Sequence, residues 1–151
     1  MSNLQLPPGR YGFDEVAPGD RIHTPKRLVT ASDIDAFASQ FGDRFEIHMD
    51  DAAARNHGFP GRVAHGLLVL SLVDGLKNQS DAQFRAIASL GWDWSFRRPV
   101  FVGDELGAVI EIMEKRKVTK PDRGILTLAF SVTNQRGEIV QDGSNKLLVY
   151  R

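Results

Sequence analysis

The chain has 151 residues, a length typical of one domain, so we expect a single domain over residues 1–151. Its nineteen basic and nineteen acidic residues cancel, which leaves no net charge to attract nucleic acid or anionic lipid. The absence of cysteine excludes disulfides, a thiolate nucleophile and cysteine metal ligands, and fits a reducing cytoplasm. Residues 1–10 lack a signal-peptide pattern, and no apolar run reaches the roughly 20 residues of a membrane span. We therefore expect a cytoplasmic protein with neither nucleic acid nor a membrane as partner.

The first part of the chain is rich in residues that interrupt regular structure. Prolines and glycines punctuate residues 1–20, which predicts an irregular lead-in closed by a turn at Pro18-Gly19. Residues 21–29 are compatible with a short strand. Because Pro25 has no backbone N–H, this strand should lie at the edge of a sheet.

A helix is expected next. Thr30 is a good N-cap, Asp33 suits the first turn, and Gly42 should end the helix. The apolar residues between these signals fall at helical spacing: Ile34, Phe37, Ala38 and Phe41.

The segment from Asp43 to His48 separates this helix from another. Asp50 or Asp51 can cap a second short helix through residues 52–56, which the Gly-Phe-Pro-Gly sequence at 58–61 stops. We therefore expect an irregular loop held by a helix at each end. Loops on such rigid supports often carry functional residues.

The sequence from His65 to Asn78 predicts the core helix. Its apolar residues cover nearly every direction around the axis, so it should be buried on most sides: Leu67, Leu68, Val69, Leu70, Leu72, Val73 and Leu76. Ser71 and Asp74 form one polar notch on this rod. Asp74 marks either a wet side that faces a pocket or the place where the helix reaches solvent.

Beyond the core helix the apolar pattern changes to a period of two. Trp92, Trp94 and Phe96 alternate with polar residues and read as sheet core before any aromatic ligand platform. Further strands are predicted near residues 106–112, 124–133 and 138–150, separated by turn signals. Helices followed by long antiparallel strands predict an α+β fold, in which a curved sheet wraps the apolar helix.

Three blocks in this order resemble the MaoC-like dehydratase and (R)-specific enoyl-CoA hydratase family, which has the hot-dog fold. The blocks are Asp43-x4-His48-x-Asp50, the stretch Val63-Ala64-His65-Gly66-Leu67-Leu68, and residues 95–106. The resemblance runs from about Thr30 to Leu106. This chain departs from the family where Phe45-Glu46-Ile47 replaces the usual Asn-Pro and apolar residue before the histidine.

The resemblance implies the roles of several residues. Asp43 and His48 would activate a water that adds to a trans-2-enoyl-CoA, and Gly66 would form the oxyanion hole. His65 and Arg98 would belong to the substrate site, with coenzyme A or an acyl carrier protein carrying the acyl group. No metal and no separate cofactor are expected. The resemblance also implies a homodimer or a dimer-built oligomer, because hot-dog subunits join their sheets edge to edge.

The residues themselves support part of this chemistry. A carboxylate and a neutral imidazole that both lie within roughly 3 Å of one water can exchange protons with it. Residues 62–65 include no capping side chain, so the helix start near Gly66 offers free N–H groups to a substrate oxygen.

Other interpretations of the same residues stay open. Asp43 alone fits a turn residue, His48 a helix entrance, and His23 and His57 the surface. Arg97 and Arg98 are either strand ends near solvent or contacts for the phosphates of coenzyme A. A hot-dog thioesterase would use Glu46 as an extra carboxylate, and a non-catalytic acyl-thioester binding protein would keep the fold without turnover.

Overall fold

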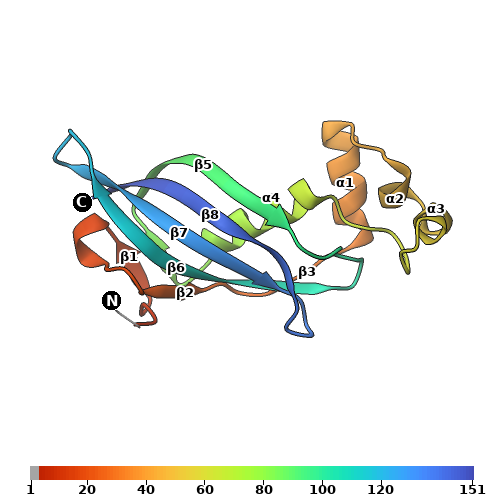
Figure 1. The fold of residues 1–151 in the computed structure, drawn as a ribbon, viewed down its shortest axis with the longest axis horizontal. Coiled ribbons are helices and arrows are strands. Elements are labelled where there is room, and N and C mark those ends of the chain that lie inside the picture. Colours follow the sequence, from red (N-terminus) through yellow and green to blue (C-terminus); the bar gives the residue numbers. More distant parts are fainter. Residues whose placement is uncertain (1–3) are drawn as a thin grey trace.

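The computed structural model, which describes residues 4–151, has a long curved sheet that wraps around one helix (Figure 1). The helices are α1 (Ala31–Phe41), α2 (Glu46–Met49), α3 (Asp51–Asn56) and α4 (Gly66–Lys77), with a 3-10 turn η1 (Phe13–Glu15). The strands are β1 (Gly9–Tyr11), β2 (Arg21–His23), β3 (Arg27–Leu28), β4 (Ala82–Phe84), β5 (Ala86–Phe96), β6 (Glu105–Lys117), β7 (Arg123–Thr133) and β8 (Ile139–Tyr150). This arrangement confirms the predicted hot-dog fold.

The main sheet has the strand order β2-β6-β7-β8-β5, and β3 also pairs with β6. All of these pairings are antiparallel, while β1 and β4 form a separate parallel pair. Alternate residues of β6 face the core, as the period of two predicted: Leu106, Ala108, Ile110 and Ile112 are buried. Helix α4 fills the hollow of the sheet, and α1, α2 and α3 gather beyond its N-terminal end (Figure 1).

Helix α1 begins and ends as its sequence predicts. The Thr30 hydroxyl accepts a hydrogen bond from the Asp33 N–H at 3.1 Å, and the Asp33 carboxylate accepts one from the Thr30 N–H at 3.0 Å. Gly42 ends the helix with a left-handed φ of 83°. The chain therefore turns sharply just before Asp43.

Several boundaries differ from those expected. The strand predicted over residues 21–29 is split into β2 and β3, because Pro25 between them cannot donate to β6. The lead-in contains β1 and η1, apart from residues 1–3, which lie outside the described residues. Strand β5 begins at Ala86 rather than near Trp92. The predicted loop from Asp43 to His48 includes the start of the one-turn helix α2.

Helix α4 is less completely covered than its sequence suggested. Its buried residues are Val69, Leu72, Val73, Leu76 and Lys77, while Leu67 near its start is 61% exposed. Asp74 forms an ion pair within the helix, since the buried Lys77 ammonium lies 2.7 Å from Asp74 Oδ1.

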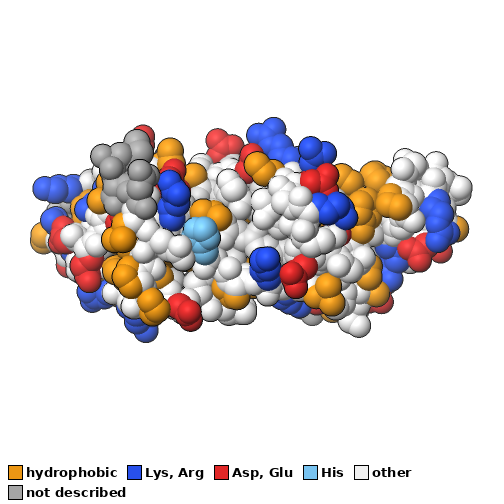
Figure 2. All heavy atoms as spheres, turned by 90° about the horizontal axis from the view of Figure 1, so that it is seen from below, with side chains coloured by type: hydrophobic (Ala, Val, Ile, Leu, Met, Phe, Trp, Pro, Cys, Tyr) orange, Lys and Arg blue, Asp and Glu red, His pale blue; other side chains and the backbone are white. Residues whose placement is uncertain are grey.

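The surface carries no concentrated charge on the face that Figure 2 shows, where basic and acidic side chains are interspersed. This distribution agrees with the zero net charge and offers no long positive track to a nucleic-acid backbone. Within residues 4–151, no helix has the length and apolarity required to cross a bilayer.

Candidate active site

The chain between α1 and α2 brings Asp43 to the surface. Asp43 directly follows the left-handed Gly42 and is exposed, with its Oδ1 accepting the Phe45 N–H at 3.3 Å. This turn leaves the second carboxylate oxygen without a hydrogen bond to residues 4–151. The carboxylate is therefore open to water or to a ligand.

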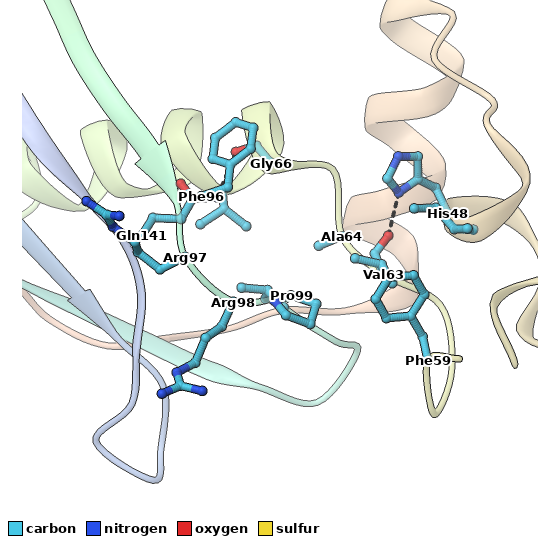
Figure 3. A pocket seen from close by; sticks show the side chains of 13 residues that line it. His48, Phe59, Val63, Ala64, Gly66, Phe96, Arg97, Arg98, Pro99 and Gln141 are labelled. Atoms are coloured by element: carbon cyan, nitrogen blue, oxygen red, sulfur yellow. Dashed lines mark hydrogen bonds between the residues drawn. The ribbon is translucent and has the colours of Figure 1, made fainter. Parts of the chain in front are cut away.

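His48 lies on α2 with its ring largely buried, at 9% exposure for the residue. Its Nδ1 is 2.6 Å from the Val63 carbonyl oxygen, the contact drawn as a dashed line in Figure 3. A carbonyl oxygen only accepts, so Nδ1 must carry the proton of a neutral ring. The Nε2 of His48 then keeps its lone pair, as a general base requires.

His65 supports the segment that carries Asp43. It is 2% exposed, and its Nε2 donates to the Asp43 carbonyl oxygen at 2.8 Å. Its Nδ1 is buried without a partner among the described residues. Burial lowers the pKa of His65 below its usual value, and the positive charge of Arg62 adds to this effect, while the hydrogen bond to the Asp43 carbonyl and the negative charge of the Asp43 carboxylate oppose it.

Aromatic rings hold the two histidines in a column. His48 and His65 stack with their centroids 3.9 Å apart, and Phe37 of α1 packs on His65 at 4.7 Å. Phe45 contacts the edge of this column, 6.1 Å from the His48 ring. The column ties α1, α2 and the start of α4 together, which fixes the orientation of His48.

Asp43, His48 and His65 each place one ligand-type atom within 4.8 Å of the other two. Two groups separated by up to that distance can bind one water between them, since each hydrogen bond to the water is about 2.8 Å long. A metal ion fits poorly, because it must lie near the plane of each imidazole about 2 Å from nitrogen. The two stacked planes, inclined by 27°, do not meet that close to the rings.

Gly66 is the first residue of α4, and no side chain caps this helix start. Its N–H has no acceptor among residues 4–151, so it remains available to a ligand oxygen. The glycine is also needed for packing: a Cβ at this position would lie 2.3 Å from the Phe96 ring. Figure 3 shows that ring beside Gly66, where β5 meets the start of α4.

A cavity of about 330 Å³ opens between these elements. Its lining is mostly apolar and includes both His48 and Gly66; the other residues are Ile47, Phe59, Val63, Ala64, Val69, Phe96, Arg97, Arg98, Pro99, Val100 and Gln141. Gln141 donates to the Gly66 carbonyl oxygen at 3.1 Å and accepts from the Trp94 indole at 2.8 Å. The start of α4 is thereby fixed against β5 and β8.

The structure brings four of the five predicted site residues to this cavity or its edge. His48, Gly66 and Arg98 line it, and Asp43 lies beside His48. His65 is absent from the cavity lining, and its Nε2 is engaged by the Asp43 carbonyl oxygen. Both arginines have exposed side chains; Arg97 pairs with Asp142 at 2.8 Å, whereas the contact of Arg98 with Glu138 is longer, at 3.9 Å.

Sequence reasoning missed the residues that build the site without touching its centre. Arg62 contacts the His48 backbone, and Gln141 contacts Gly66 from a strand 75 positions away. No local pattern marks either residue. An arginine inside an otherwise apolar approach to the core helix was the one available signal for Arg62.

Comparisons with known proteins identify relatives of this chain. The sequence profile of the family described as "MaoC like domain" matches residues 14–134. The chain is 39% identical over 121 residues to Protein MaoC of Klebsiella aerogenes, covering 79% of this chain but only 35% of that protein. It is 34% identical over 125 residues to the (R)-specific enoyl-CoA hydratase of Aeromonas caviae, covering 83% and 89% of the two chains. An R-hydratase structure from Pseudomonas aeruginosa superposes with a TM-score of 0.76 at 30% identity, over 91% of this chain and 84% of that one.

Proposed function

The chain belongs to the MaoC-like family, and from this premise and the site around His48 we propose that it is a hydratase-type lyase. The reaction is the reversible addition of water to a trans-2-enoyl thioester. Relatives named (R)-specific enoyl-CoA hydratase and 3-hydroxybutyryl-CoA dehydratase support this class. By analogy with the first, we propose syn addition and an (R)-3-hydroxyacyl product.

One observation carries the proposal. A carboxylate oxygen of Asp43 and a ring nitrogen of His48 lie within 4.8 Å of each other, beside a cavity that both His48 and Gly66 line. These are the groups that hydration of a conjugated thioester needs: a base for water and a donor for the thioester oxygen. Their placement beside a mostly apolar cavity suits an acyl substrate.

The proposed step balances protons within the pair. As the water oxygen bonds to the β-carbon, one water proton passes to the Asp43–His48 pair. The electron pair of the double bond moves toward the thioester, and the Gly66 N–H stabilises the negative charge on the carbonyl oxygen. A proton from the pair then reaches the α-carbon, which returns both side chains to their starting state. Dehydration is the reverse.

Coenzyme A or an acyl carrier protein would bind outside the cavity. Arg98 is exposed at the rim and extends away from His48 in Figure 3, and its contact with Glu138 is long, at 3.9 Å. Its guanidinium therefore has donors available for phosphate oxygens. Arg97 is the weaker candidate, because Asp142 already pairs with it. We place this chemistry in the cytoplasm, which suits a chain without cysteine.

A thioesterase would send water to the carbonyl carbon and would use Glu46 as its carboxylate. Glu46 instead forms an exposed hydrogen bond with His57, whose Nε2 lies 2.7 Å from Glu46 Oε1. This contact directs the carboxylate toward the end of α3. The geometry therefore favours the lyase over the thioesterase.

Incubation with crotonyl-CoA separates the functions in one assay. A hydratase removes the enoyl absorbance without releasing thiol, a thioesterase releases free coenzyme A, and a binding protein does neither. We expect loss of absorbance at a rate proportional to enzyme, with the (R)-enantiomer as product on chiral analysis. Release of thiol at the rate of substrate loss would overturn the proposal.

A further inference from the structure

Arg62 is a largely buried arginine between α1 and α2, with a side chain only 13% exposed. Its Nε donates to the His48 carbonyl oxygen at 2.6 Å, and its Nη2 donates to Asp35 on α1. Its backbone N–H donates separately to Asp51 Oδ1 at 2.9 Å. The side chain thus joins α1 to the residue that carries the proposed base.

Helix α2 depends on such outside contacts, because four residues are too few to form a stable helix alone. Its last carbonyl oxygens need hydrogen-bond donors from outside the helix. The Glu46 oxygen accepts from Asp50 at 3.1 Å and the Ile47 oxygen from the Val63 N–H at 3.0 Å. The His48 oxygen accepts from Arg62.

The His48 ring is held by the same segment of chain. Its Nδ1 donates to the Val63 carbonyl oxygen, and Val63 directly follows Arg62. Arg62 therefore holds the backbone of His48, and the next residue, Val63, holds its ring. Without the guanidinium, the His48 carbonyl loses a charge-assisted partner, and α2 keeps fewer contacts to hold the ring in line with the Val63 oxygen.

We propose that Arg62 is a positioning residue that sets the aim of His48 through the His48 carbonyl, with Asp35 holding the guanidinium in place. The effect on turnover rests on the proposed hydratase function, whereas the effect on the His48 ring does not. Arginine suits this place because its planar fork reaches two acceptors at once. A lysine ammonium at the end of a flexible stem holds such a geometry less well.

Arg62→Met removes the fork while keeping an unbranched apolar stem of similar length. The backbone bond from residue 62 to Asp51 is unaffected by the change, so the loop keeps one anchor. We expect the kcat for crotonyl-CoA to fall about 10- to 100-fold, a usual cost of misplacing a catalytic group by about 1 Å. The KM should stay within about threefold. Arg55→Met on α3 is the matched control, because Arg55 is exposed and its loss changes the charge equally.

Measuring the Arg62→Met change in a protein that already carries His48→Gln tests whether Arg62 acts through His48 or independently of it. In His48→Gln, the Arg62→Met change should lower the remaining turnover less than about twofold, because there is no base left to aim. If the two losses multiply, or if Arg62→Met alone keeps turnover within twofold, the proposal is wrong.

Nitrogen-15 NMR of the His48 ring tests the inference without any turnover. The wild type should show one protonated and one unprotonated ring nitrogen, and Arg62→Met should average the two signals as the Val63 bond weakens. Unchanged His48 signals in a folded variant would overturn the proposal even if the chain has no hydratase activity. Arg62→Lys, with a smaller change of the same sign, serves the same test if Arg62→Met does not fold.

Discussion

At the scale of single residues, Asp43 and His48 are held in different ways. The fold fixes the His48 ring through Val63, whereas it fixes Asp43 through its backbone, which leaves the carboxylate exposed. We expect Asp43→Asn and His48→Gln each to lower crotonyl-CoA turnover by roughly 10² to 10⁴, because each keeps its size while losing its proton-transfer group. Steady-state kinetics at equal substrate saturation measures both losses.

The losses from changing Asp43 and His48 should also be coupled. If both side chains act on one water, the double variant should lose much less than the product of the single losses. Butyryl-CoA, a saturated analogue, should still bind each variant with similar affinity in calorimetry, because Gly66 is unchanged. Multiplying losses, or wild-type rates in both single variants, would rule out a shared water.

His65 gives the protein a specific sensitivity to acid. Because burial lowers its pKa in the folded state, the unfolded chain takes up a proton as the pH falls below about 6.5 while the folded chain does not. The free energy of unfolding should therefore decrease from that pH downward until the folded pKa is passed. Above about pH 7, His65 makes no pH-dependent contribution.

Urea unfolding at pH 7.5 and at pH 5.5 measures this effect. We expect His65→Gln to lose less stability between the two pH values than the wild type, with a difference in slope of at most about 1.4 kcal/mol per pH unit. His23→Gln is the control, since His23 is exposed and should follow the wild type. Equal losses in the wild type and His65→Gln would show that His65 titrates normally in the folded protein.

At the scale of elements, the parts with local signals were predictable from sequence. Thr30 and Gly42 mark the ends of α1 because caps act over one turn, and the alternation in β6 follows from burial of one face. Helix α2 was not predictable, because its carbonyl groups are satisfied by Arg62 and Val63 rather than by its own sequence. The first half of β5 was missed because both of its faces are largely exposed, so it shows no alternation.

The same reasoning applies to the candidate site. The sequence blocks pointed to Asp43, His48 and Gly66 as candidates, but the hydrogen bond from His65 to the Asp43 carbonyl depends on how the chain folds between them. The packing reason for Gly66 depends on Phe96, which lies on a strand 30 positions away. Such contacts are set by tertiary structure and leave no periodic signal.

Glu46 connects α2 to the end of α3 through His57. Both side chains are about half exposed, so the pair contributes roughly 0–1 kcal/mol and should not control the chemistry. We expect Glu46→Gln to keep crotonyl-CoA turnover within about tenfold, with any larger effect confined to the preference between acyl chains. Rates with a series of enoyl-CoA lengths measure this. Complete loss of turnover in a folded Glu46→Gln protein would make Glu46 catalytic and favour the thioesterase.

At the scale of the whole molecule, β5 is the end strand of the sheet, and its outer edge has no strand beside it among residues 4–151. It is 11 residues long and mostly exposed, and Leu90 and Phe96 are each more than half exposed. A long apolar edge of this kind promotes pairing with another chain. Antiparallel pairing of two β5 strands about a two-fold axis would continue the sheet and cover these residues.

We therefore predict a homodimer, or an oligomer built from such dimers, at micromolar concentration. Light scattering coupled to gel filtration should give at least twice the mass of one chain. Leu90→Lys puts a charge at the middle of the edge and should shift the protein toward the monomer. Met113→Lys is the matched control: Met113 is 45% exposed on β6, away from this edge, so that variant should remain associated. A wild type that stays monomeric under these conditions would contradict edge pairing, and dissociation of both variants alike would show that β5 is not the interface.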